Sequence, residues 1–153
     1  MVNQNKFQIL QKECSNCIKC SLSSTRNNVV FGRGNPSSKL FVIGEGPGQQ
    51  EDEQGLAFVG RAGKMLDSAF LSVGIDTNED CYISNIVKCR PPNNRKPLAN
   101  EVTECMPWLN KQIQMVQPKV IVLAGSTAVQ SCLNVDEPIS CLLYTSPSPR
   151  DIS

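Results

Sequence analysis

Short apolar runs alternate with amphipathic stretches along this chain, and the alternation predicts its secondary structure. Short runs rich in β-branched residues predict buried strands at residues 39–43, 81–87 and 119–124. Apolar residues at three- and four-residue spacing predict helices at residues 7–13, 60–73, 99–116 and 126–133. Strands and helices therefore follow one another in turn over most of the chain.

This order of elements predicts an α/β fold, a three-layer sandwich with a short parallel sheet between helices. The functional loops are expected at the carboxyl ends of the strands, near residues 44–48, 85–92 and 125–127. Gly, Asn and Pro at residues 32–36 predict a turn-rich loop. The acidic residues 51–53 are expected to form a loop.

Length and composition indicate one ordinary globular domain. The chain has 153 residues, 40% of them hydrophobic, and a formal net charge of +1. Without an excess of basic residues, any contact with nucleic acid must use local patches of charge. No apolar stretch approaches the ~20 residues that cross a bilayer, so we expect a cytoplasmic protein with no membrane segment.

The chain has eight cysteines and no histidine, and both counts limit its chemistry. Without histidine, Ser-His-Asp and Cys-His catalysis and histidine-containing zinc sites are excluded. A Cys-x-x-Cys pair near the N-terminus, together with distant Cys89 and Cys105, suits a tetrahedral zinc ion or an iron–sulfur cluster. The spacing does not separate these metals, and Cys81 and Cys132 are expected to be core residues.

A glycine-rich turn, residues 44–48, follows the first predicted strand. It is not a dinucleotide-binding turn, because Gln49 stands where that motif continues, and it lacks the Gly-Lys-Ser/Thr ending of a P-loop. The turn instead offers backbone N–H groups that approach a planar ligand closely, with the carboxylate of Glu45 among them.

Several longer motifs resemble one known family. The chain is similar to the family 4 uracil-DNA glycosylases, the iron–sulfur branch of that superfamily, over about residues 14–134. The motifs that carry the resemblance are Cys17–Arg26, Val29–Pro36, Gly44–Asp52, Gly55–Gly63, Asn85–Arg95 and residues 118–121.

The resemblance implies a structural four-cysteine iron–sulfur cluster, [4Fe–4S], with zinc as the alternative. The implied ligands are Cys17, Cys20, Cys89 and Cys105. In the family the second ligand stands two residues before a leucine and six before an arginine, which matches Cys20 with Leu22 and Arg26. The alternative register uses Cys14 and Cys17 and leaves Cys20 as an extra thiol.

The resemblance also implies a pocket for uracil extruded from DNA. Asn85 matches the amide that distinguishes uracil from cytosine, and Phe58 matches the aromatic that stacks on the base. The implied uracil-binding residues are Glu45, Gly46, Pro47, Phe58 and Asn85. Glu45 is the first catalytic candidate and Glu51 the second, the latter also excluding the methyl group of thymine. Asp52 and Glu53 are expected to be solvated.

Basic residues of the proline-rich loop are candidates for DNA phosphate contacts. They are Lys88, Arg90, Arg95 and Lys96. The implied activity is hydrolysis of the N-glycosidic bond of uracil in base excision repair, by a monomer acting on uracil-containing DNA. The alternative is a non-catalytic nucleic-acid-binding module with an iron–sulfur or zinc site.

The chain departs from the family near its C-terminus. The family continues with a further strand, a helix and a His-Pro-Ser motif whose histidine stabilises the uracil oxygen, whereas this chain has no histidine. We therefore expect an incomplete glycosylase-like domain at residues 1–139, with the last strand and helix missing. Residues 140–153 look like an unrelated tail resembling translated sequencing-adapter sequence. Weak or absent activity is the expected consequence.

Overall fold

The computed structural model describes residues 2–133. The predicted domain boundary at residue 139, the predicted tail and the expected loss of the last strand and helix concern residues outside this range. The elements are α1 (Gln4–Ser15), the 3-10 helix η1 (Ser21–Ser24), β1 (Arg33–Gly34), β2 (Leu40–Gly44), α2 (Gln49–Gln54), α3 (Arg61–Leu71), β3 (Cys81–Asn85), the 3-10 helix η2 (Pro92–Asn94), α4 (Ala99–Val116), β4 (Val120–Leu123) and α5 (Ser126–Leu133).

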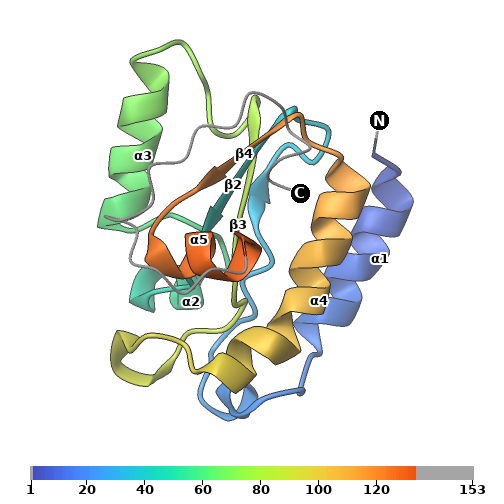
Figure 1. The fold of residues 1–153 in the computed structure, drawn as a ribbon, viewed down its shortest axis with the longest axis vertical. Helices are drawn as coiled ribbons and strands as arrows, with labels where there is room; N and C mark the ends of the chain where they lie inside the picture. The colour runs from blue at the N-terminus through green and yellow to red at the C-terminus, as the bar shows by residue number, and fades with distance from the viewer. Residues whose placement is uncertain (1, 134–153) are drawn as a thin grey trace.

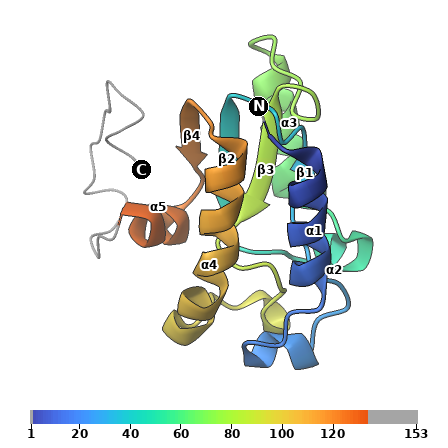
Figure 2. The same cartoon turned by 90° about the vertical axis from the view of Figure 1, so that its right-hand side faces the viewer.

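Helices cover both faces of a four-stranded sheet. The strand order is β1-β3-β2-β4, and β2 pairs in parallel with both β3 and β4. Helices α1 and α4 lie side by side on one face, and α3 lies on the other (Figures 1 and 2). The predicted three-layer α/β arrangement is confirmed.

Alternate side chains of β2 pack against different helix layers, as the pleat of a strand requires. Phe41 and Ile43 belong to the core cluster that includes Leu109 of α4. Val42 belongs to the opposite cluster, against which Phe70 of α3 packs. The apolar run is therefore continuous because both faces of the strand are covered.

The sheet is mixed rather than wholly parallel, because the turn predicted at residues 32–36 contains β1, which pairs antiparallel with β3. Two residues are too few to show a strand period. The pairing also needs glycine, since a Cβ on Gly34 would lie 2.3 Å from the carbonyl oxygen of Cys81.

The acidic segment predicted as a loop forms helix α2. Its six residues have no apolar stripe, so the sequence period gave no helical signal. Gly55 ends the helix in the left-handed conformation, with φ of 75°. The prediction that Asp52 is solvated is wrong, since this residue of α2 is buried.

Candidate active site and metal centre

A cavity of about 310 Å³ opens at the carboxyl ends of β2 and β3. The predicted site residues that line it are Glu45, Gly46, Pro47, Glu51, Phe58, Asn85 and Arg95. The glycine turn and the segment after β3 lie together because backbone hydrogen bonds between them continue past the ends of β2 and β3. Ile86 N–H donates to Gly44 O at 2.8 Å, and Val87 N–H donates to Glu45 O at 3.1 Å.

Gly44 allows two walls of this cavity to meet. It pairs with Asn85 in the parallel register of β2 and β3. A Cβ on Gly44 would lie 2.4 Å from Cζ of Phe58 and 2.6 Å from Oδ1 of Asn85. The missing side chain therefore gives the space in which the aromatic ring and the amide approach each other.

Asn85 combines burial with a free amide. The residue is 2% exposed, and no hydrogen bond of its side-chain amide is found among residues 2–133. The amide nitrogen and oxygen are not themselves fully buried, because Ser38 Oγ is the one buried side-chain polar atom without a partner in the described part of the chain. The Asn85 amide is therefore available to a molecule that enters the cavity.

Lys88 supports Asn85 from inside the protein and is not a surface cation. Its side chain is buried, and Nζ donates to Asn85 O at 2.6 Å and to Ser84 Oγ at 2.9 Å. Burial lowers the pKa of Lys88 to about 8. The predicted phosphate contact is therefore wrong for Lys88, because its ammonium faces strand β3 and not solvent.

Glu45 stands at the exposed mouth of the cavity. Thr127 Oγ1, at the start of α5, donates to Glu45 Oε2 at 2.5 Å. The sequence analysis placed residues 125–127 among the expected functional loops but named no residue of this loop as a site residue, so it missed this contact. The available signal was the position of Thr127 after β4, because β4 is the parallel neighbour of β2.

Glu51 ties the glycine turn to the loop that carries Phe58. One carboxylate oxygen accepts from Gly48 N–H at 2.9 Å, and the other accepts from Val59 N–H at 3.0 Å and Gly60 N–H at 2.7 Å. The structure thus gives Glu51 a clear positioning role, while the catalytic role remains a prediction.

Replacing Glu51 with alanine is expected to lower the free energy of unfolding by about 3 kcal/mol, since three charge-assisted hydrogen bonds are lost. The matched control is Glu53→Ala, on the exposed side of the same helix, with an expected change within about 0.5 kcal/mol. Urea denaturation measures both values. Equal losses in the two variants would show that the buried contacts of Glu51 do not matter.

Asp52 joins the same framework to the chain that leads into β1. Its carboxylate accepts from Asn27 N–H at 2.9 Å, from Asn27 Nδ2 at 2.7 Å and from Asn28 N–H at 3.1 Å. The helix points this side chain inward, whereas Glu53 is exposed as predicted. The acidic segment therefore orders the edge of the cavity.

Arg95 lines the cavity but is already paired. Its guanidinium donates to both carboxylate oxygens of Glu101, each at 2.8 Å, and these hydrogen bonds hold the pKa of Glu101 below its ordinary value. Arg90 Nε donates to Asn94 Oδ1 at 2.7 Å. The phosphate contacts predicted for both arginines remain predictions.

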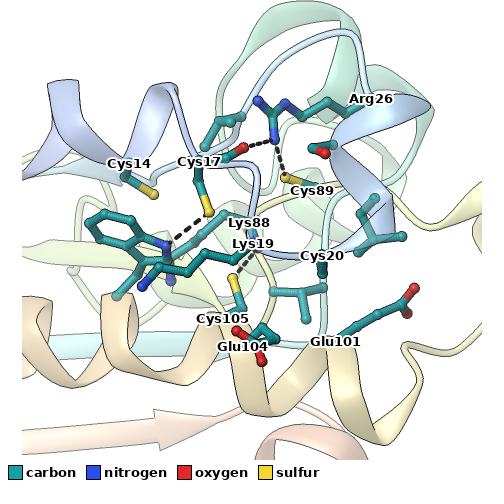
Figure 3. A pocket seen from close by; sticks show the side chains of 15 residues that line it. Cys14, Cys17, Lys19, Cys20, Arg26, Lys88, Cys89, Glu101, Glu104 and Cys105 are labelled. Atoms are coloured by element: carbon teal, nitrogen blue, oxygen red, sulfur yellow. Dashed lines mark hydrogen bonds between the residues drawn. The ribbon is translucent and has the colours of Figure 1, made fainter.

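Five cysteines line a second pocket (Figure 3). They are Cys14, Cys17, Cys20, Cys89 and Cys105. The fold brings them from α1, the loop after it, the end of β3 and α4. The four predicted ligands are thus brought together, and Cys14 of the alternative register is among them.

Polar N–H groups point at three of these sulfurs. Arg26 Nη1 approaches Cys89 Sγ at 3.5 Å, Trp108 Nε1 approaches Cys17 Sγ at 3.4 Å, and Lys88 N–H approaches Cys105 Sγ at 3.3 Å. N–H donors of this kind stabilise thiolates and the sulfurs of clusters. The donor set therefore fits an iron–sulfur cluster.

Burial makes several of these thiols weaker acids. Burial raises the pKa of Cys14 to about 12 and that of Cys89 to about 11. Metal binding must therefore displace protons from these sulfurs. Within residues 2–133, no three His, Cys, Asp or Glu side chains are grouped as ligands of one metal ion. Cys81 is buried in β3, and Cys132 packs against the core, as predicted for both.

The cavity lies at the carboxyl ends of the parallel strands β2 and β3, and the same molecule has a pocket lined by five cysteines. The family model of the uracil DNA glycosylase superfamily matches residues 31–153. The chain therefore belongs to the uracil-DNA glycosylase superfamily, and the resemblance read from its motifs is confirmed.

Within this superfamily, the chain is similar to type-4 uracil-DNA glycosylases. The chain is 44% identical over 124 residues to the type-4 uracil-DNA glycosylase of Archaeoglobus fulgidus, covering 81% of this chain and 62% of the relative. It is 45% identical over 123 residues to the type-4 enzyme of Thermotoga maritima, covering 80% and 64%. The chain thus spans less than two thirds of the length of these relatives.

One similar protein carries a name other than glycosylase. The chain is 31% identical over 99 residues to a protein named DNA polymerase from Bacillus phage SP01, covering 65% of this chain and 11% of that protein. Separately, none of the helices in the described part is long and apolar enough to cross a membrane.

Proposed function

We propose that the chain is a type-4 uracil-DNA glycosylase, which takes a uracil extruded from DNA into the cavity and hydrolyses its N-glycosidic bond. The observation that carries the proposal is the unpaired side-chain amide of Asn85, a largely buried residue that lines the cavity beside Phe58, over the gap at Gly44.

The amide and the ring together suit one pyrimidine. An asparagine amide donates from nitrogen and accepts at oxygen, so it pairs with O4 and N3–H of uracil. Cytosine carries an amino group at position 4 and an acceptor at N3, which reverses both requirements. Phe58 supplies the flat apolar face on which an extruded base stacks.

Glu45 is the proposed catalytic carboxylate. When the bond between the sugar carbon and the base nitrogen breaks, uracil leaves with the electron pair and the sugar becomes electron-poor. Thr127 fixes the carboxylate at the cavity mouth, where it can orient water or stabilise the cationic sugar. Gly46 of the glycine turn lines the cavity, and its backbone N–H is the proposed donor to the uracil oxygen that gains charge.

The five-cysteine pocket supports a structural [4Fe–4S] cluster held by Cys17, Cys20, Cys89 and Cys105. When bound, the cluster cross-links the N-terminal segment to the end of β3 and to α4. Four cysteine thiolates suit an iron–sulfur cluster, and zinc remains the alternative. Arg26 lies at this centre, because it donates to Cys17 O at 2.6 Å and approaches Cys89 Sγ at 3.5 Å, but both cysteines belong to either register.

Uracil release in a single turnover tests the function directly. The 153-residue chain is incubated with single-stranded oligonucleotides that contain uracil or thymine at one position, and free base is quantified. We expect release of uracil only, and an about 100-fold slower rate for Glu45→Gln. The control is Glu53→Gln, which is exposed and lies outside the cavity lining.

The absence of histidine sets the expected rate of this chain. One electrostatic donor to the leaving base is worth about 10²- to 10³-fold, so release is expected to be slower than in the longer relatives by that order. Equal affinity for uracil and thymine DNA, with no uracil released, would refute the proposed function and support a non-catalytic binding module.

A further inference from the structure

Arg33, which sequence reasoning passed over, uses all of its hydrogen-bonding capacity beneath the Phe58 loop. Its side chain is 9% exposed, and each of its five N–H donors has an acceptor. The acceptors are Ala57 O at 2.6 Å from Nε, Phe58 O at 3.0 Å and Asp67 Oδ1 at 2.9 Å from Nη2, and Thr77 Oγ1 at 3.2 Å and Asn78 Oδ1 at 2.9 Å from Nη1.

The loop held in this way is strained. Phe58 has φ of 56°, in the left-handed region that bulky residues rarely adopt. Its carbonyl also lies against helix α3, because a Cβ on Gly63 would be 1.8 Å from Phe58 O. Such a conformation persists only where surrounding contacts determine it, and it is typical of functional sites.

Two groups hold the strained residue from opposite sides. Arg33 binds the carbonyl oxygens of Ala57 and Phe58, whereas Glu51 binds the N–H groups of Val59 and Gly60. The peptide groups on both sides of the Phe58 side chain are therefore fixed. The ring position over Gly44 follows from these two clamps.

We propose that Arg33 is a positioning residue that holds the Phe58 ring ready to stack on the extruded base; the proposal rests on the proposed function of the cavity. Asp67 and Thr77 orient the guanidinium, since Thr77 Oγ1 donates to Asp67 Oδ1 at 2.6 Å and both also contact Arg33. The network joins β1 and α3 to the cavity without touching the substrate.

Lysine cannot take this place. It has the same charge but only three donors on one atom, with no planar fork to reach carbonyl oxygens on one side and Asp67 and Thr77 on the other. Arg33→Lys therefore keeps the charge and removes the geometry, whereas Arg33→Gln removes both. The pair of variants separates charge from positioning.

A double-mutant cycle with Phe58→Ala tests the connection. We expect Arg33→Lys and Arg33→Gln to slow single-turnover uracil release by about 10- to 100-fold, because a misplaced group costs on that order. In the Phe58→Ala background the same substitutions are expected to change the rate by less than about threefold. The control is Lys39→Gln, because Lys39 is an exposed residue that directly precedes β2. An equal loss in both backgrounds would overturn the proposal.

Amide hydrogen exchange gives a readout that needs no activity. Exchange at Val59 and Gly60 is expected to be about 10-fold faster or more in both Arg33 variants, with α4 amides such as that of Leu109 unchanged. Unchanged exchange at Val59 and Gly60, or a uniform rise across the fold, would contradict a local clamp. A wild-type chain that releases no uracil would instead refute the function while leaving the exchange result valid.

Discussion

Replacing Asn85 with alanine is expected to lower the single-turnover rate of uracil release by about 10²- to 10³-fold, the usual cost of removing one essential donor in a closed site. Asn85 is 2% exposed, and no described residue forms a hydrogen bond with its amide, so we expect the amide to interact with the base alone. Loss of the amide therefore removes the recognition of O4 and N3–H without breaking a contact within residues 2–133.

The same substitution should remove discrimination between bases. Binding of single-stranded oligonucleotides with uracil or cytosine at one position is measured for wild type, Asn85→Ala and the control Asn110→Ala, an exposed residue of α4. Wild type and the control are expected to favour uracil, and Asn85→Ala to bind both equally. A retained preference in Asn85→Ala would mean that another group reads the base.

Fold elements with a long local period could be predicted from the sequence. The bounds predicted for the longest helix, Ala99–Val116, agree with those of α4, because its apolar face repeats over many turns. Elements that depend on tertiary contacts could not. Strand β1 has only two residues, and α2 is polar throughout and is held by the buried carboxylate of Asp52.

The site divides in the same way. The glycine turn and Asn85 lie at strand ends, where ligand sites of parallel sheets form, so their proximity could be predicted. Lys88 was expected on the surface, as lysines usually are, because nothing local shows that Ser84 and Asn85 accept from its ammonium. The roles of Arg33 and Thr127 depend on segments distant in sequence that only the fold brings together.

Replacing Cys105 with serine is expected to abolish iron binding and to lower the free energy of unfolding by at least about 3 kcal/mol, comparable to losing a native cross-link. Cys105 lies on α4, whereas Cys17 and Cys20 belong to the N-terminal segment, so the cluster would fasten one to the other. Iron, acid-labile sulfide and zinc are measured on anaerobically purified protein, and stability by urea denaturation.

Cys132→Ser provides the matched control, because this thiol is half-buried in α5 and lies outside the five-cysteine pocket. It should keep iron and sulfide at the wild-type level. Cys14→Ser and Cys20→Ser then decide the register, since both thiols line the pocket and only one completes the proposed set. Iron is expected to be retained in Cys14→Ser and lost in Cys20→Ser. The reverse result would assign the cluster to Cys14, and zinc without sulfide in the wild-type chain would replace the cluster by a single ion.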